Sequence, residues 1–194
     1  MRAFLAVPVP DPAAGEVRSL LHTLRHELPD VRWVSEESPH ITVHFFGSID
    51  ESEAQRALLA VTPVLQTVRP FACTLDRLGS FPARGAPRVL WLGPSEPSRA
   101  LIDVTRQCRA ALAGAGFVVE EREYRPHCTL GRPRSAWDGA TIARFRSLDE
   151  GECSITFTAT CLTLFESQIS PRGAVHIPRA TLQMNGATQD EPDA

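Results

Sequence analysis

The stretch SPHITVHFFG, residues 38–47, decides the fold and raises the question of function. It reads as a β-strand, in which side chains two residues apart point to the same face. One predicted face is apolar and consists of Ile41, Val43 and Phe45. The other face carries two imidazoles and a hydroxyl, from His40, Thr42 and His44. Imidazole and hydroxyl groups side by side on the face opposite an apolar core face indicate a functional site.

A second stretch, RPHCTLGR at residues 125–132, repeats the pattern. Here His127 and Thr129 share a face, and each His-x-Thr motif follows a proline. A single His-x-Thr pair in a strand is most often a solvent-facing or hydrogen-bonded pair. Two copies, both on strands with an apolar back, favour a shared function.

Two histidines beside two threonines suit acid–base chemistry on a phosphodiester. Histidine has an unperturbed pKa of about 6.5, so one imidazole can take a proton from water while an imidazolium gives one to the leaving oxygen. The threonine hydroxyls can donate to the non-bridging phosphate oxygens. Because protons and hydroxyls handle the charge, we predict no cofactor. His40 and His44 lie on one predicted face and could both ligate a metal ion, but no third ligand is evident, so we predict no metal.

Composition narrows the possible partners and chemistries. The chain has 194 residues and a formal net charge of −3, which three acids in the last few residues account for: Asp190, Glu191 and Asp193. A neutral body has no overall basic field for long duplex nucleic acid, although a few converging arginines could hold a small anion. All 20 basic residues are arginines, so a P-loop, a nucleotidyl-lysine ligase and a Schiff-base enzyme are excluded.

The cysteines and the N-terminus predict a reduced, cytoplasmic protein. Five cysteines, an odd number with no C-x-x-C pair, fit buried thiols better than disulfides or zinc. The opening MRAFLAVPVP resembles a first strand and makes a poor signal peptide, and no apolar run is long enough to span a membrane. We expect a monomer with no membrane partner.

Hydrophobic periodicity predicts a mixed α+β fold with largely antiparallel sheets. The two motifs echo one another, so we predict a single bilobal domain over 1–184 with pseudo-duplicated halves, and an acidic, disordered tail over 185–194. The expected strands are 3–9, 31–34, 40–46, 71–78, 88–93, 127–132, 153–167 and 174–182. The expected helices are 12–28, 50–65, 96–116 and 136–148.

At this point the residues resemble a known family. The two H-x-T-x motifs, at His40 and His127, look like the signature of the 2H phosphoesterase superfamily. Longer blocks, in order over about residues 1–182, resemble the bacterial and archaeal RNA 2′,3′-cyclic phosphodiesterases, historically called 2′-5′ RNA ligases. These blocks are MRAFLAVPVP (1–10), VRWVSEESPHITVHFFG (31–47), RVLWLG (88–93), RPHCTLGR (125–132) and LTLFESQISPRGAVH (162–176).

The resemblance implies a bilobal fold with two mainly antiparallel sheets around a central cleft. It implies metal-independent hydrolysis of an RNA 2′,3′-cyclic phosphate end to a 2′-phosphomonoester, with reversal as 2′-5′ ligation. By the family pattern, His127 accepts a proton from water and His40 donates one to the leaving 3′-oxygen. Thr42 and Thr129 hold the phosphoryl oxygens.

Three further residues have alternative interpretations. Arg132 matches an arginine often found after the second motif, but strict alternation turns it away from His127 unless the strand ends or bulges at Gly131; a surface salt bridge is the alternative. His44 would either contact RNA or be a solvated edge residue. His176 stands where relatives often carry tyrosine, which would alter base stacking.

Two other functions compete with RNA-end hydrolysis. One is a 2H phosphodiesterase for a small nucleotide, such as a 2′-5′ oligonucleotide or an ADP-ribose cyclic phosphate. The other is a non-catalytic module that binds RNA ends. Binding alone does not need two titrating groups, so the paired histidines favour an enzyme whose partners are RNA 2′,3′-cyclic phosphate ends or small cyclic nucleotides.

Overall fold

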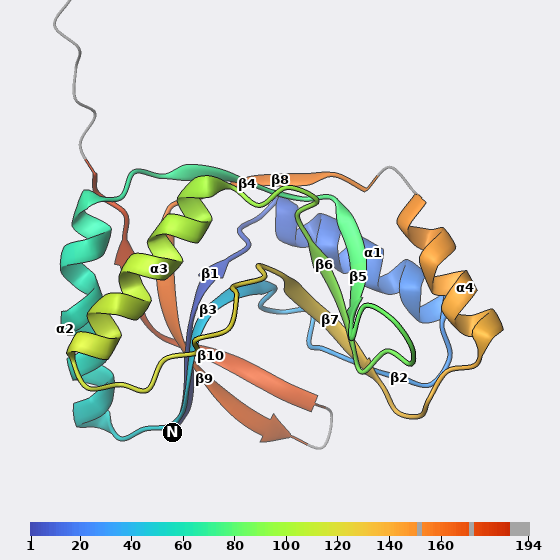
Figure 1. Ribbon diagram of the computed structural model, residues 1–194, viewed down its shortest axis with the longest axis horizontal. Helices are drawn as coiled ribbons and strands as arrows, with labels where there is room; N and C mark the ends of the chain where they lie inside the picture. The colour runs from blue at the N-terminus through green and yellow to red at the C-terminus, as the bar shows by residue number, and fades with distance from the viewer. Residues whose placement is uncertain (151–152, 171–172, 187–194) are drawn as a thin grey trace, which may run out of the picture.

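The computed structural model describes residues 1–150, 153–170 and 173–186, and it is the mixed α+β protein expected from the sequence (Figure 1). The strands are β1 (Arg2–Pro8), β2 (Val31–Trp33), β3 (His40–Ser48), β4 (Phe71–Leu75), β5 (Arg77–Phe81), β6 (Val89–Gly93), β7 (Cys128–Pro133), β8 (Ile155–Ala159), β9 (Cys161–Ser170) and β10 (Gly173–Gln183). The helices are α1 (Ala13–Glu27), α2 (Glu51–Thr67), α3 (Arg99–Gly114) and α4 (Gly139–Ser147), with a 3₁₀ turn at Leu148–Glu150.

The strands form a large sheet and a small one, and every pairing between described strands is antiparallel. The large sheet has the order β10-β9-β1-β3-β7-β6-β5, with β2 paired to β7, and the small one pairs β4 with β8. Between β3 and β7 the only residue partners are Ile41 and Cys128, both buried. The large sheet is therefore two sheets joined at one point, which confirms the predicted two-sheet architecture.

Each half of the large sheet carries its own pair of helices. The first, here called the His40 lobe, contains β1, β3, β9 and β10 with α2 and α3, which stand together at one end of the molecule (Figure 1). The second, called the His127 lobe, contains β2, β5, β6 and β7 with α1 and α4 (Figure 1). Because β1 is followed by α1 and the chain then returns to β3, the lobes are interwoven rather than successive.

Two predicted strands are wrong because each contains a corner. The expected strand over 71–78 is divided at Asp76 into β4 and β5, and the expected strand over 153–167 is divided at Thr160 into β8 and β9. In both cases the first piece joins the small sheet and the second joins the large sheet. At the first corner the Asp76 carboxylate accepts hydrogen bonds from the backbone N–H and hydroxyl of Ser95, at 2.6 and 2.7 Å. The buried positions change phase across this corner, from Cys73 and Leu75 to Leu78, so the corner left a signal in the alternation that the prediction did not use.

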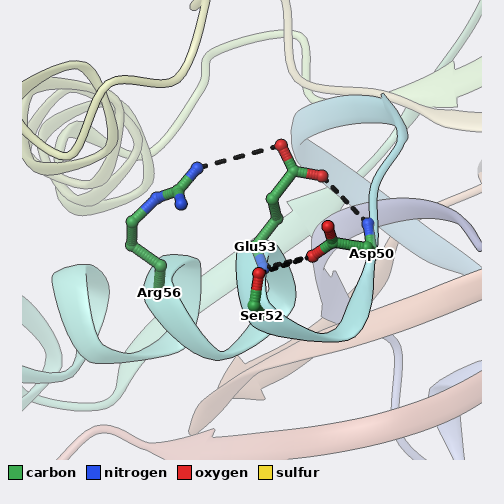
Figure 2. A network of polar contacts seen from close by, with 4 residues as sticks. All are labelled: Asp50, Ser52, Glu53 and Arg56. Carbon is green, nitrogen blue, oxygen red and sulfur yellow. Dashed lines mark hydrogen bonds and ion pairs between the residues drawn. The ribbon is translucent and has the colours of Figure 1, made fainter.

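A capping box starts α2 directly after the strand that carries the first motif (Figure 2). The Asp50 side chain accepts hydrogen bonds from the Glu53 backbone N–H and the Ser52 hydroxyl, both at 2.8 Å. The Glu53 carboxylate in turn accepts from the Asp50 N–H at 2.9 Å and lies 3.8 Å from the guanidinium of Arg56. Such a box satisfies two donors that the helix leaves free, so it fixes where the chain leaves β3.

The predicted tail over 185–194 lies mostly outside the described residues. Of its members only Asn185 and Gly186 are described, and their backbone N–H groups donate to the carbonyls of Leu65 and Val68 at the end of α2. These two residues therefore continue the packing of β10 against that helix.

Candidate active site

The four predicted site residues meet where the two lobes join. Extending the register of β3 and β7 from their single pairing places His40 beside Thr129 and Thr42 beside His127. One cavity of about 260 Å³ is lined by His40, Thr42 and Thr129. A wider groove of about 860 Å³ is lined by Thr42 and His127. Thr42 lines both spaces, so the two motifs border one continuous region of the surface.

Both histidines are anchored to the backbone in the same way. The Nδ1 atom of His40 lies 2.7 Å from the carbonyl oxygen of Ser38, and that of His127 lies 2.7 Å from the carbonyl oxygen of Arg125. A carbonyl only accepts, so Nδ1 carries the hydrogen in each ring. In the neutral ring Nε2 is then the basic nitrogen. The proline between each histidine and its carbonyl partner holds the chain in the extended form that this contact uses.

Aromatic rings support each imidazole. On the His40 side, Phe4 stacks on the ring with centroids 4.7 Å apart, and Phe165 lies at 5.7 Å. On the His127 side, Phe81 contacts the ring edge at 5.0 Å, and Trp91 lies at 6.4 Å. These four aromatic residues come from β1, β9, β5 and β6, and they orient the two imidazoles. Sequence analysis missed them, because they resemble ordinary core residues.

Burial makes both imidazoles less basic. It is the largest cause that lowers the pKa of His40 to about 4, and the nearby charges of His176 and His127 lower it further against the opposing hydrogen bond to Ser38. Burial also lowers the pKa of His127, as does the charge of Arg132, while the hydrogen bond to Arg125 opposes both. Both rings are therefore mainly neutral near pH 7 until an anion arrives.

A half-buried tyrosine, Tyr124, connects the segment before the second motif to the first motif. The Tyr124 hydroxyl donates to the backbone carbonyl of Thr42 at 3.0 Å. Arg109 of α3 lies over the Tyr124 ring at 5.0 Å, and its Nε donates to the carbonyl of Val43 at 3.1 Å. These contacts fix the segment before His127 against β3. No local pattern in the sequence marked either residue.

His44 lines the wider groove with Thr42 and His127, but it does not share the face of His40 and Thr42, so the predicted alternation is wrong at this residue. In the pairing with β1, Leu5 is the partner of His44 and Ala6 that of Thr42, so Val43 is an extra residue, a β-bulge. Beyond the bulge the alternation changes phase: His44 is only 3% exposed and packs against Phe46. Phe45, 47% exposed, takes the surface position and lines both the cavity and the groove.

Arg132 reaches the site because of a second bulge. Trp91 is the partner of Thr129 whereas Leu90 is the partner of Gly131, so Leu130 is an extra residue in β7. This is the irregularity next to Gly131 that the sequence required. The exposed Arg132 lines the cavity that also contains His40 and Thr129. Within the described part of the chain its guanidinium has no carboxylate partner, which disfavours the alternative of a surface salt bridge.

His176, from β10, forms one wall of the same cavity. Its ring meets that of His40 edge-on, with centroids 5.1 Å apart, and also contacts Phe4 at 5.0 Å. Burial lowers the pKa of His176. The residue therefore packs directly on a site histidine instead of standing apart at the rim.

Other chemistries find little support in the part of the chain that the structure describes. Burial raises the pKa of the Cys128 thiol, which lies behind the site, to about 11, so the thiol is protonated at neutral pH. No group of three or more metal-ligating side chains is present among residues 1–150, 153–170 and 173–186. None of the described helices is both long and apolar enough to span a membrane.

Comparisons with known proteins agree with the geometry. The family model described as the 2′-5′ RNA ligase superfamily matches residues 9–168. The RNA 2′,3′-cyclic phosphodiesterase of Methanocaldococcus jannaschii is 28% identical over 180 residues, which cover 91% of this chain and 96% of that protein. The protein of the same name from Archaeoglobus fulgidus is 30% identical over 178 residues, again 91% of this chain and 96% of that one.

Solved structures with the same fold extend over nearly the whole chain. Escherichia coli LigT, crystallised with 3′-AMP, has a TM-score of 0.74 and 23% identity, and the match covers 94% of this chain and 97% of that one. The protein TT0787 of Thermus thermophilus has a TM-score of 0.77 and 19% identity, with 96% and 99% covered. At these identities the likeness shows the fold.

Proposed function

The chain belongs to the 2′-5′ RNA ligase superfamily, and on that premise we propose that it hydrolyses RNA 2′,3′-cyclic phosphate ends to 2′-phosphomonoesters without a metal ion. One observation carries the proposal. Two imidazoles, each with Nδ1 bound to a backbone carbonyl, leave two Nε2 atoms for chemistry in a region that both threonines line. The names of the relatives support the same substrate class.

The reaction needs one proton removed and one supplied. In our assignment Nε2 of His127 takes a proton from water as the water oxygen bonds to phosphorus. The bond from phosphorus to the 3′-oxygen breaks, and Nε2 of protonated His40 gives its proton to that oxygen. The products are a 2′-phosphomonoester and a free 3′-hydroxyl. Attack by a 5′-hydroxyl in place of water would give a 2′-5′ linkage, which accounts for ligation by the same groups.

The threonines and Arg132 would hold the phosphate during this exchange. The Thr42 and Thr129 hydroxyls can each donate to a non-bridging oxygen, and such a donor contributes roughly 10²–10³-fold when it meets developing charge. Arg132 lines the cavity with His40 and Thr129, so its guanidinium can offer a charged pair of donors. Together the two hydroxyls and the guanidinium stabilise the negative charge of the phosphate without a metal ion.

The substrate itself sets the protonation state of the acid. With its pKa lowered to about 4, His40 is neutral near pH 7 in the empty site. A bound phosphate monoanion beside the ring favours the imidazolium and raises that pKa. The donor is therefore charged only when there is a phosphate to receive the proton.

The test is turnover of a short oligoribonucleotide that ends in a 2′,3′-cyclic phosphate, in the presence of EDTA, with the product resolved as a 2′- or a 3′-phosphate. We expect a 2′-phosphate at a rate that EDTA does not change. Loss of turnover in EDTA, or a 3′-phosphate product, would contradict the proposal.

A parallel assay distinguishes substrate classes. Adenosine 2′,3′-cyclic phosphate and an ADP-ribose cyclic phosphate are supplied at the same concentration as the RNA. A higher kcat/KM for either small nucleotide than for the oligonucleotide would favour the small-nucleotide enzyme instead. We further propose that the protein acts in the cytoplasm as a monomer. Size-exclusion chromatography with light scattering tests the monomer, and fractionation of cells tests the location.

A further inference from the structure

Four arginines line a groove on the His127 lobe. They come from β2, from the start of β6 and from the end of β7, and they are Arg32, Arg88, Arg132 and Arg134, all exposed. The groove has a volume of about 580 Å³, and its remaining lining residues are Ala86, Pro87, Pro133, Ser135 and Ala136. None of these lining residues, all of them described, carries a carboxylate or an aromatic ring.

The positive charges in this groove are mostly unneutralised. Arg32 and Arg132 are direct partners across the β2–β7 pair, an arrangement of like charges that destabilises a sheet. Among the residues that the structure describes, neither they nor Arg88 has a carboxylate partner. Arg134 alone has one, with Nε 3.9 Å from an Asp30 carboxylate oxygen. Such a concentration of charge in a chain with a net charge of −3 indicates a site for an anion.

The groove continues from the active site. Arg132 lines both the groove and the cavity that contains His40 and Thr129. A chain whose terminal phosphate lies between the histidines can therefore pass Arg132 and enter the groove.

We propose that this groove binds backbone phosphates of the RNA on the 5′ side of the cyclic phosphate. The inference rests on the proposed function. It adds that the protein binds several nucleotides of the RNA strand and not only the terminal one. Guanidinium groups match phosphate oxygens with paired hydrogen bonds. Without aromatic residues the groove offers no stacking surface, so it reads the backbone and leaves the base sequence unread.

The test compares a hexaribonucleotide that ends in a 2′,3′-cyclic phosphate with adenosine 2′,3′-cyclic phosphate. The variant is the full-length Arg32→Gln/Arg88→Gln protein. Its matched control is Arg99→Gln/Arg106→Gln, which removes the same charge from two exposed arginines of α3 that do not line the groove. Arg132 is left in place because it also lines the catalytic cavity.

We expect the groove variant to lose roughly 10-fold in kcat/KM for the hexanucleotide at low salt and nothing for the mononucleotide. For the hexanucleotide, kcat/KM should also depend less on salt. The negative slope of log kcat/KM against log salt concentration should become shallower by about 1.4, which is ~0.7 for each phosphate that the variant no longer binds. The α3 control should match the wild type on both substrates. An unchanged ratio between the two substrates, or an equal loss in the control, would overturn the inference.

A failure of the proposed function would look different. If the wild type hydrolyses neither substrate, the groove is tested by binding alone, using fluorescence anisotropy of a labelled hexanucleotide that ends in a 3′-phosphate. Tighter binding by the wild type than by the groove variant, with the α3 control equal to the wild type, would support the groove. Equal binding by all three proteins would overturn it.

Discussion

The two halves of the site use the same anchor in different surroundings. His40 lies at the start of a strand, stacked on Phe4 and in edge contact with His176. His127 lies one residue before β7, in edge contact with Phe81 and near the charge of Arg132. Each Nδ1 lies 2.7 Å from the carbonyl two residues earlier. The shared anchor fixes which nitrogen reacts, and the unlike neighbours let one ring serve as acid and the other as base.

The largest expected effect comes from removing either of the two imidazoles, His40 or His127. His40→Ala and His127→Ala should each lower kcat on an RNA cyclic phosphate by ~10²–10⁴-fold, because each removes one proton transfer. The double variant should be little worse than either single one, since the two groups act as a unit. His22→Ala, an exposed histidine of α1, is the control. Multiplicative losses in the double variant would mean that the histidines act independently.

The threonines test whether the two halves hold the phosphate equally. Thr42→Val and Thr129→Val keep the branched shape and remove one hydroxyl donor each. We expect kcat to fall by up to ~10²–10³-fold with KM changed less, since the donors act mainly on the transition state. Thr42 lines both the cavity and the groove, so its loss should be the greater. If both substitutions change KM more than kcat, the threonines bind the substrate but do not stabilise the transition state.

His44 shows what a histidine turned towards the core contributes. It is buried, and neither ring nitrogen has a hydrogen-bond partner among the residues that the structure describes. Burial, followed by the charge of Arg109, lowers its pKa from 6.5 to about 4. The unfolded chain then binds a proton that the folded chain does not, so stability is full above pH 6.5 and falls as the pH falls towards 4. A shift of this size corresponds to roughly 3 kcal/mol.

The variant His44→Leu removes this dependence. We expect its free energy of unfolding, measured in urea at pH 7 and pH 5, to fall less on acidification than that of the wild type, while kcat on the cyclic phosphate stays within about twofold. The same fall in stability as in the wild type would contradict the assignment of His44 to the core.

A smaller effect is expected from disturbing the aromatic residues around His127 alone. A Cβ on Gly79 would lie 2.1 Å from an atom of the Trp91 indole, which lies beside His127. Gly79→Ala should therefore displace the indole, cost about 1–3 kcal/mol of stability and lower kcat more than KM. Gly139→Ala is the control, because nothing lies within 4 Å of the Cβ it would add. Equal stability of the two variants would show that the indole moves freely.

The sequence predicted the elements of the site because the relevant pattern is local. Two-residue alternation in each motif was enough to place His40 with Thr42 and His127 with Thr129, and helical spacing was enough to find the four helices. The supporting rings of Phe4, Phe81, Trp91 and Phe165 come from strands far apart in the chain, and nothing in their own neighbourhoods marks them.

Two bulges explain the remaining differences. Each adds one residue to a strand and reverses which face the later side chains occupy. The bulge at Val43 turns His44 towards the core, where it keeps only a small exposed part in the wider groove, and the bulge at Leu130 brings Arg132 into the cavity. The first left no signal in the sequence, whereas Gly131 marked the position of the second. Alternation is therefore dependable only up to the first bulge.

The central claim, an acid at His40 and a base at His127, is tested most directly by changing the leaving group. Wild type, His40→Ala and His127→Ala are compared on the RNA cyclic phosphate and on an analogue with sulfur in place of the leaving 3′-oxygen. A thiolate leaves without a proton, because thiols are far more acidic than alcohols. We predict that His40→Ala recovers to within roughly 10-fold of wild type on the sulfur substrate, since it lacks only the transfer to the leaving group, whereas His127→Ala stays impaired by ~10²–10⁴-fold. Equal impairment of His40→Ala on both substrates would contradict the account.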